Sequence, residues 1–84
     1  MFTIIKTIES GLIHKIVAID DDHLLCGGYE FLMVLQVSDI SIIVKEQNKY
    51  NIRDIVRVNK ENEFALAGDF VINFIKIDSV TFAI

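Results

Sequence analysis

The chain repeats its own pattern of apolar residues after a shift of about 39–40 positions. Polar positions coincide as well, since Gln36 aligns with Lys76 as the polar residue of an otherwise apolar run. The matched pairs include Ile4 with Ile43, Ile5 with Val44, Lys6 with Lys45, Ile16 with Ile55, Val17 with Val56 and Gly28 with Gly68. This pattern predicts a single domain, residues 1–84, made of two tandem units at approximately residues 2–40 and 41–84.

The residue types of both units favour β-strands. Ile, Val, Phe and Thr dominate and Pro is absent, and β-branched and aromatic side chains suit the pleated surface of a sheet. A helix over residues 10–19 is the alternative for one segment, because its apolar residues also fit helical spacing. We predict strands at residues 2–8, 12–19, 23–26, 29–37, 40–46, 52–58, 62–67, 69–77 and 80–84.

Several of these strands are apolar on both sides. Leu32 and Val34 alternate with Met33 and Leu35, so each face of that strand is hydrophobic. The predicted fold is therefore all-β: a small barrel or sandwich built from two tandem units of about four strands with pseudo-two-fold symmetry. The last strand, residues 80–84, begins a third copy of the pattern and is expected to pair with the N-terminal strand or with another subunit.

Composition indicates that the chain associates with itself. Hydrophobic residues make up 52% of its 84 residues, yet a chain this small buries only about 60–65% of its unfolded surface. Part of the apolar surface should lie in an interface, and a homo-oligomer is the simplest arrangement. The net charge of -4 and the lack of a basic cluster argue against a nucleic-acid partner.

The single cysteine, Cys26, excludes an internal disulfide and fits a reducing compartment. No secretory signal pattern is found at the N-terminus, and the longest apolar run is far too short to cross a bilayer. We therefore expect a cytoplasmic protein without a membrane partner.

No group of residues has the spacing of a catalytic or metal-binding motif. Asp20, Asp22 and His23 could supply metal ligands, but a solvated acidic turn explains them better. Cys26 lies in an apolar run and is expected to be a small core residue rather than a nucleophile. No catalytic residue, metal site or cofactor is predicted.

Residues near the predicted turns are the candidates for binding. Glu30 and Asp69 occupy matching positions after each glycine turn, and exposed aromatic rings commonly anchor interfaces. The candidate binding residues are Tyr29, Glu30, Tyr50, Asp69 and Phe70.

These observations favour a non-enzymatic binding protein that acts as a homo-oligomer and occupies the surface of a partner protein. Small acidic proteins of the inhibitor or immunity type, including anti-defence proteins of phages, are the class-level analogy. One alternative is a protein that binds or sequesters a small molecule, a nucleotide or metabolite, in a pocket between subunits. Another is a structural subunit of a larger particle.

Overall fold

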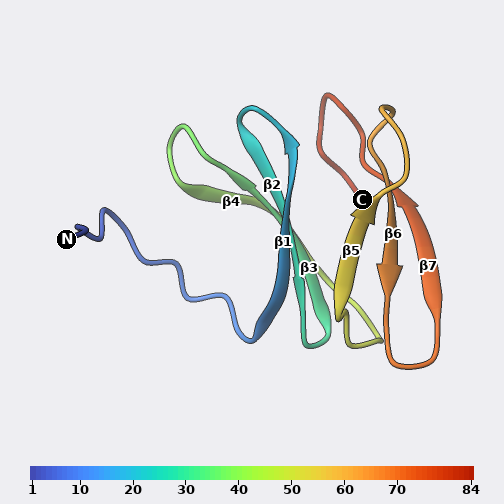
Figure 1. The fold of residues 1–84 in the computed structure, drawn as a ribbon. Coiled ribbons are helices and arrows are strands. Elements are labelled where there is room, and N and C mark those ends of the chain that lie inside the picture. The colour runs from blue at the N-terminus through green and yellow to red at the C-terminus, as the bar shows by residue number, and fades with distance from the viewer.

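The structure, a computed structural model, describes all 84 residues and contains seven strands and no helix (Figure 1). The strands form two antiparallel sheets, one of four strands in the order β1-β2-β3-β4 and one of three in the order β5-β6-β7. The all-β prediction is confirmed. The strands are β1 (Ile13–Asp20), β2 (His23–Gly28), β3 (Phe31–Gln36), β4 (Ser41–Gln47), β5 (Asp54–Arg57), β6 (Glu63–Ala67) and β7 (Ile72–Lys76).

Two predicted strands are absent, at residues 2–8 and 80–84. Residues 2–8 have the composition of a strand, but no backbone hydrogen bond joins them to a neighbouring strand. Residues 80–84 belong to a turn, since the Asp78 carboxylate accepts the N–H groups of Val80 and Thr81 and the Asp78 N–H donates to Ala83. The helical alternative for residues 10–19 is wrong, because β1 occupies most of that segment.

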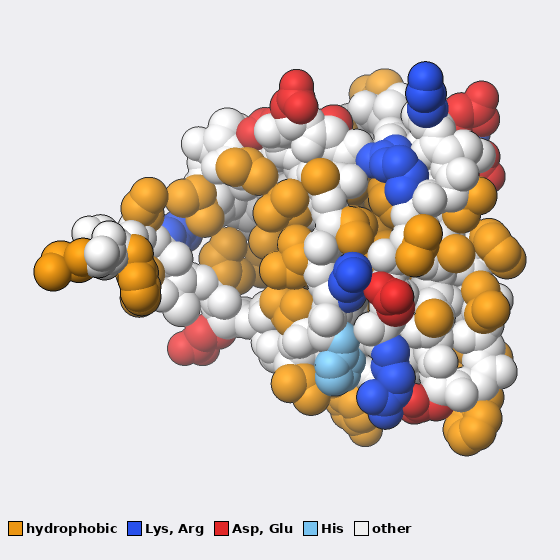
Figure 2. All heavy atoms as spheres, viewed as in Figure 1, with side chains coloured by type: hydrophobic (Ala, Val, Ile, Leu, Met, Phe, Trp, Pro, Cys, Tyr) orange, Lys and Arg blue, Asp and Glu red, His pale blue; other side chains and the backbone are white.

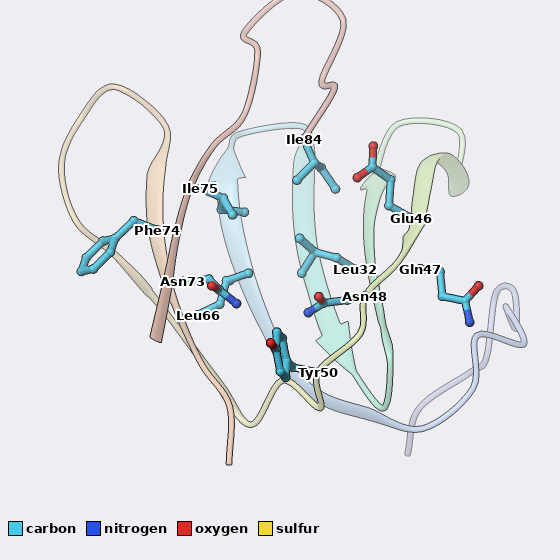
Figure 3. Close-up of a pocket in the computed structure, with 10 residues that line it drawn as sticks. All are labelled: Leu32, Glu46, Gln47, Asn48, Tyr50, Leu66, Asn73, Phe74, Ile75 and Ile84. Carbon is cyan, nitrogen blue, oxygen red and sulfur yellow. The ribbon is translucent and has the colours of Figure 1, made fainter. Parts of the chain in front are cut away.

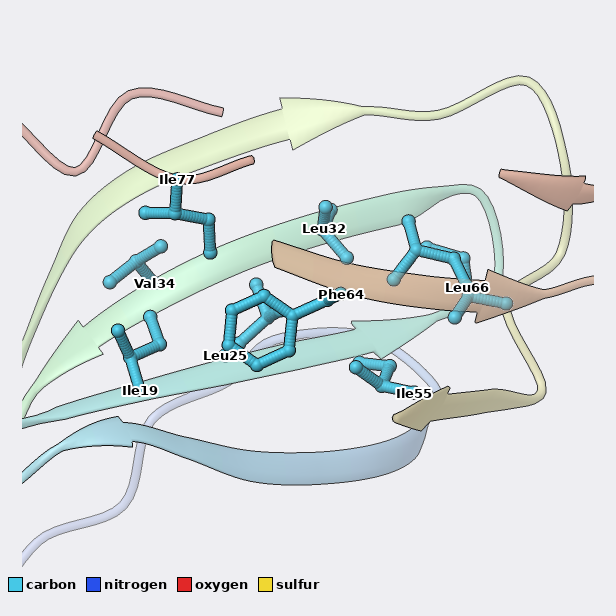
Figure 4. Packing of buried hydrophobic residues seen from close by; sticks show 9 residues of the cluster. Ile19, Leu25, Leu32, Val34, Ile55, Phe64, Leu66 and Ile77 are labelled. Atoms are coloured by element: carbon cyan, nitrogen blue, oxygen red, sulfur yellow. The ribbon is translucent and has the colours of Figure 1, made fainter. Parts of the chain in front are cut away.

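The main core lies between the two sheets (Figure 4). Leu25 and Val34 of the first sheet face Ile55 and Phe64 of the second, and all four side chains are fully or almost fully buried. The cluster consists of Ile19, Leu25, Leu32, Val34, Ile52, Ile55, Phe64, Leu66 and Ile77. A smaller cluster of Cys26, Phe31 and Met33 lies on the other face of the first sheet, so this sheet is apolar on both sides.

The predicted pseudo-two-fold symmetry is not confirmed. Ile16 of β1 is exposed, whereas the residue aligned with it in the second unit, Ile55 of β5, is buried in the core. Conversely, Val34 of β3 is buried and its aligned residue, Phe74 of β7, is 73% exposed. The two sheets therefore meet through faces that are not equivalent in the repeat, whereas a two-fold relation would bring equivalent faces together.

One side of the two-sheet arrangement is closed and the other is open. Arg57 of β5 donates hydrogen bonds to the carbonyl oxygens of Ala18, at 3.1 Å, and Ile19 in β1. Lys15 of β1 also forms an ion pair with Asp54 of β5, with Nζ and Oδ1 3.2 Å apart. No such connection joins β4 to β7, so the sheets do not form a closed barrel.

The glycine pair predicted to form the first unit's third turn lies instead at the end of β2. The turn itself is Tyr29 and Glu30, and Glu30 has the left-handed backbone conformation, with φ of 61°. Gly28 is needed for close packing, because a Cβ atom there would lie 1.9 Å from the carbonyl oxygen of Leu12. Absence of a side chain, rather than backbone conformation, therefore explains this glycine.

Exposed large apolar side chains outnumber buried ones. Figure 2 shows hydrophobic side chains along the N-terminal segment, over the first sheet beside it, and over the second sheet at the opposite side of the molecule. The structure contains no helix of the length and apolarity needed to span a bilayer. One copy of the chain therefore leaves many large apolar side chains exposed.

Candidate functional site

Three connections between strands meet at one end of the molecule. They are the β2–β3 turn, the segment between β4 and β5, and the β6–β7 turn. Backbone hydrogen bonds hold the middle segment between the two turns: Asn48 donates to Glu30 at 2.8 Å, Ile52 to Gly28 at 2.9 Å, and Arg53 to Ala67 at 2.8 Å. These hydrogen bonds hold segments that are distant in sequence beside one another.

These connections surround a hollow of about 250 Å³, which we call the end hollow. All five residues predicted as binding candidates line it. Lys49 and Asn51 were missed, because neither stands out from an ordinary polar loop in the sequence. The lining residues are Tyr29, Glu30, Lys49, Tyr50, Asn51, Asp69 and Phe70.

The end hollow is rich in exposed aromatic surface. Tyr29 and Tyr50 are 57% and 39% exposed, and Phe70 is 97% exposed. Leaving a phenyl ring in water forgoes roughly 2 kcal/mol of burial free energy. Aromatic rings of this kind are the residues that most often dominate the binding energy of protein interfaces. The geometry therefore suits contact with another molecule.

Charged groups of both signs border the aromatic rings. The Asp69 carboxylate accepts a hydrogen bond from Nε of Arg53, and the two side chains form an ion pair. Lys49 places its ammonium group 5.6 Å from the centre of the Tyr50 ring. The Oδ1 atom of Asn51 is buried without a hydrogen-bond partner, which leaves one acceptor of the hollow unsatisfied.

The acidic cluster of the β1–β2 turn is held by internal hydrogen bonds. His23 Nδ1 lies 2.8 Å from Oδ1 of Asp20, and the Asp22 carboxylate accepts the N–H and hydroxyl groups of Ser38. Partial burial raises the pKa of Asp20, but hydrogen bonds from Asp22 and His23 outweigh it and bring the pKa below its ordinary value. No group of three or more His, Cys, Asp or Glu side chains is arranged to hold a metal ion.

Cys26 is a buried core residue, as its apolar surroundings in the sequence predict. It lies in β2 opposite Ile16 on one side and Met33 on the other. Burial raises the pKa of its thiol to about 11. The thiolate is the nucleophilic form of cysteine, so this side chain is unsuited to catalysis at neutral pH.

A larger cavity of about 400 Å³ opens between the sheets on the side where β4 and β7 are not joined. We call it the inter-sheet cavity. In Figure 3, Leu32 and Ile84 point toward its interior, whereas Phe74 points away. Glu46, Asn48 and Asn73 contribute polar groups to its lining, and only Asn73 has a signal in the sequence, as a polar residue within an apolar strand. This cavity lies within one copy of the chain.

A third hollow, of about 480 Å³, lies on the other side of the Tyr29–Glu30 turn. The N-terminal segment borders it through Ser10, whose carbonyl oxygen accepts a hydrogen bond from Lys45. The ammonium group of Lys45 also lies 5.1 Å from the centre of the Phe31 ring. The Tyr29–Glu30 turn is therefore accessible from two sides.

In comparisons with known protein families, curated proteins and solved structures, no match to this chain was found.

Proposed function

We propose that this is a non-enzymatic binding protein that acts as a homo-oligomer and occupies the surface of a partner protein. The observation that carries the proposal is the end hollow, where Tyr29, Tyr50 and Phe70 expose aromatic surface beside charges of both signs. The surrounding strands fix this group of residues through the backbone hydrogen bonds of the segment between β4 and β5. A preorganised aromatic surface of this kind favours protein binding.

An inhibitor or immunity-type role, such as that of phage anti-defence proteins, is the form of binding that fits best with a small acidic chain. The net charge of -4 favours a partner with a basic surface, because complementary charge speeds encounter. The reduced, buried Cys26 is compatible with the cytoplasm as the place of action. This part of the proposal rests on class-level analogy.

We also propose that the chain arose by duplication of one β unit. In β1 and β2, Ile16 pairs with Cys26, and Ile55 pairs with Leu66 in β5 and β6. These pairs are equivalent when β2 takes the shift of 40 that also aligns Gly28 with Gly68. In the next hairpin, the partners of His23 and Glu63 are likewise aligned residues, Gln36 and Lys76. The two units therefore pair their strands in the same register. This supports a common origin, because a slip of one residue in either unit would turn the side chains of that strand to the opposite face of the sheet.

The binding proposal is tested by affinity capture from the native host, followed by calorimetry with the purified captured protein. Replacing Phe70 by Ala should weaken binding at least tenfold, because truncating an anchoring aromatic residue commonly costs 2 kcal/mol or more. The control is Val80→Ala, which truncates another highly exposed apolar side chain, outside the hollow, and should leave affinity within twofold. Equal affinity of the Phe70→Ala variant and the native chain would refute the end hollow as the binding site.

The inter-sheet cavity supports small-molecule binding as a second candidate function. It combines apolar walls with the polar groups of Glu46, Asn48 and Asn73, the usual composition of a ligand pocket. Native mass spectrometry of gently purified protein would reveal a retained metabolite. A nucleotide or metabolite bound at one per chain, and lost in an Asn73→Leu variant, would favour this function over protein binding.

A further inference from the structure

The N-terminal segment has the sequence of a strand but no strand to pair with. Phe2, Ile4 and Ile5 are 85%, 69% and 86% exposed. Only side-chain contacts tie this segment to the rest of the molecule, including a 2.7 Å hydrogen bond from Lys6 Nζ to the carbonyl oxygen of Ile40. An extended apolar segment without Pro is a ready partner for an open sheet edge.

The edge of β7 is open. Its only strand partner is β6, and no further backbone hydrogen bond reaches β7 from elsewhere in the chain. The C-terminal residues do not cover it as a strand, because they close into the Asp78 turn, with Phe82 stacked on His23. The inter-sheet cavity opens beside this edge, and Asn73 and Ile75 of β7 line it.

The repeat identifies the strand that is missing at this edge. In the first sheet, β3 has β4 as its outer neighbour. The second-unit equivalent of β3 is β7, and the N-terminal residues Ile4, Ile5 and Lys6 align with Ile43, Val44 and Lys45 of β4. The N-terminal segment therefore has the sequence pattern of the strand that β7 lacks.

We infer that residues 2–8 of a second copy of this chain add to the free edge of β7 as a fourth, antiparallel strand. This inference rests on the homo-oligomerisation proposed above and names the contact that produces it. The added strand restores in the second sheet the order found in the first, where four strands pair in sequence. It follows the general mode of strand addition, in which backbone hydrogen bonds supply affinity and alternate side chains supply specificity.

The register follows from that of β3 and β4. Val34 pairs with Val44 and Met33 with Lys45 in the first sheet. By equivalence, Phe74 pairs with Ile5 of the second copy, which covers its exposed ring with an apolar side chain.

The same register places Lys6 of the second copy opposite Asn73, which lines the inter-sheet cavity. The cavity lining contains one charged residue, Glu46, so a lysine brought to its mouth has the complementary charge.

We place the donor strand on another copy of the chain. Figure 1 shows the N-terminal segment and β7 at opposite ends of the molecule, with both sheets between them. The chain is fixed at Leu12, whose carbonyl oxygen accepts a 2.9 Å hydrogen bond from the Tyr29 N–H. The ten residues before Gly11 span roughly 33 Å when extended, enough to place a strand on an adjoining molecule.

Because donor and acceptor are different surfaces, the contact is head-to-tail. Assemblies of this type form closed rings when the rotation between copies closes, and filaments when it does not. Each copy then donates one strand and receives one. Reciprocal exchange between two copies is the smallest closed ring, and in it each donor strand meets the β7 edge of the other copy rather than a second donor strand.

The test combines two variants, Ile5→Pro in the donor strand and Phe74→Glu at the acceptor edge. Proline removes a backbone donor needed for pairing, and glutamate puts a charge where Ile5 packs. Both positions are exposed in one copy of the chain, so circular dichroism should show an unchanged β fold. In light scattering at micromolar concentration, each variant alone should be monomeric, and an equimolar mixture should form a one-to-one dimer.

The dimer in the mixture arises because the Phe74→Glu chain keeps its donor and the Ile5→Pro chain keeps its acceptor. Ile5→Val, which retains strand propensity and apolar character, serves as the control and should assemble like the native chain. A mixture that stays monomeric, or an Ile5→Pro chain that assembles as well as the native chain, overturns the inference.

Covalent trapping provides the register test. Chains carrying Ile5→Cys and Phe74→Cys, mixed and mildly oxidised, should form a disulfide-linked dimer, since directly opposite residues approach within disulfide range. Ile5→Cys mixed with Val56→Cys, on the far strand of the same sheet, should not. A native chain that is monomeric would refute homo-oligomerisation itself, whereas an assembled chain unaffected by Ile5→Pro would refute only the strand exchange.

Discussion

At the scale of single residues, burial decides which chemistry a side chain can perform. Cys26 is completely buried between Ile16 and Met33, and burial raises its thiol pKa to about 11. We expect no reaction of native protein with a thiol reagent such as Ellman's reagent at pH 8, and full reaction in denaturant. Rapid labelling of the folded chain would contradict the core position of this cysteine.

Glu30 shows the opposite situation, an exposed residue in an unfavourable backbone conformation. Its φ of 61° costs a non-glycine residue about 1 kcal/mol, and the residue lines the end hollow. Replacement by Gly should raise the free energy of unfolding by about 0.5 kcal/mol in urea titrations, because part of the gain is offset by chain entropy. If Glu30 contacts the partner, the same variant should bind more weakly despite being more stable.

Gly28→Ala is the matched change in the same hairpin, with the opposite expectation. A Cβ atom at Gly28 would lie 1.9 Å from the Leu12 carbonyl oxygen, so the backbone would have to move. Overpacking of this kind costs about 3 kcal/mol. Urea unfolding of both variants, side by side with the native chain, measures the two effects. Unchanged stability of Gly28→Ala would show that the Leu12 contact is not retained in solution.

At the scale of strands, the sequence predicts element type better than partners. β-Branched composition and alternation identify all seven strands, because these signals are local. They fail at residues 2–8 and 80–84, which have strand composition but no partner edge within the chain. Pairing is a property of two segments, so a pattern within one segment cannot determine it.

The candidate site follows the same principle. Proximity to predicted turns was enough to select Tyr29, Glu30, Tyr50, Asp69 and Phe70, because hairpin turns carry exposed side chains. Their meeting in one hollow depends on backbone hydrogen bonds between segments distant in sequence, which no local pattern encodes. The sequence does not predict which face of each sheet lies inside for a related reason: strands apolar on both sides leave the choice of inner face open.

Arg57 is the main side-chain connection between β5 and β1. Its guanidinium group donates to the Ala18 and Ile19 carbonyl oxygens and lies 4.8 Å from the centre of the Phe64 ring. Arg57→Met keeps most of the apolar stem but removes these donors. We expect a loss of about 1–2 kcal/mol in the free energy of unfolding, measured by urea titration. Loss of less than the titration error would show that core packing and the Lys15–Asp54 ion pair hold the two strands together without Arg57.

At the scale of the whole molecule, carboxylates stabilised in the fold should make it sensitive to acid. The hydrogen bond from Lys15 lowers the pKa of Asp54, and backbone N–H groups of Thr81 and Val80 lower that of Asp78. Groups with a lowered pKa in the folded state stabilise it fully above their ordinary pKa and lose this effect as the pH falls through the folded value. The urea concentration at the midpoint of unfolding should therefore stay constant near neutral pH and decline below about pH 5.

Asp54→Asn provides the control for acid sensitivity, since it removes one of these carboxylates while keeping a similar shape. Its midpoint should be lower than that of the native chain at pH 7 and should change less between pH 7 and pH 3. A midpoint of the native chain that rises on acidification would contradict the direction of all these pKa changes.

Two phenylalanines on adjacent strands separate folding from assembly. Phe64 of β6 is fully buried between the sheets, and Phe74 of β7 is 73% exposed. Phe64→Ala should cost about 3–5 kcal/mol at every protein concentration, because it leaves a cavity in the core. Phe74→Ala should leave the unfolding of dilute monomer unchanged but should remove the added stability that the native chain gains at high concentration. Equal losses from both variants in dilute solution would mean that Phe74 is covered within one copy, and its ring would then be unavailable to pack against Ile5 of a second chain.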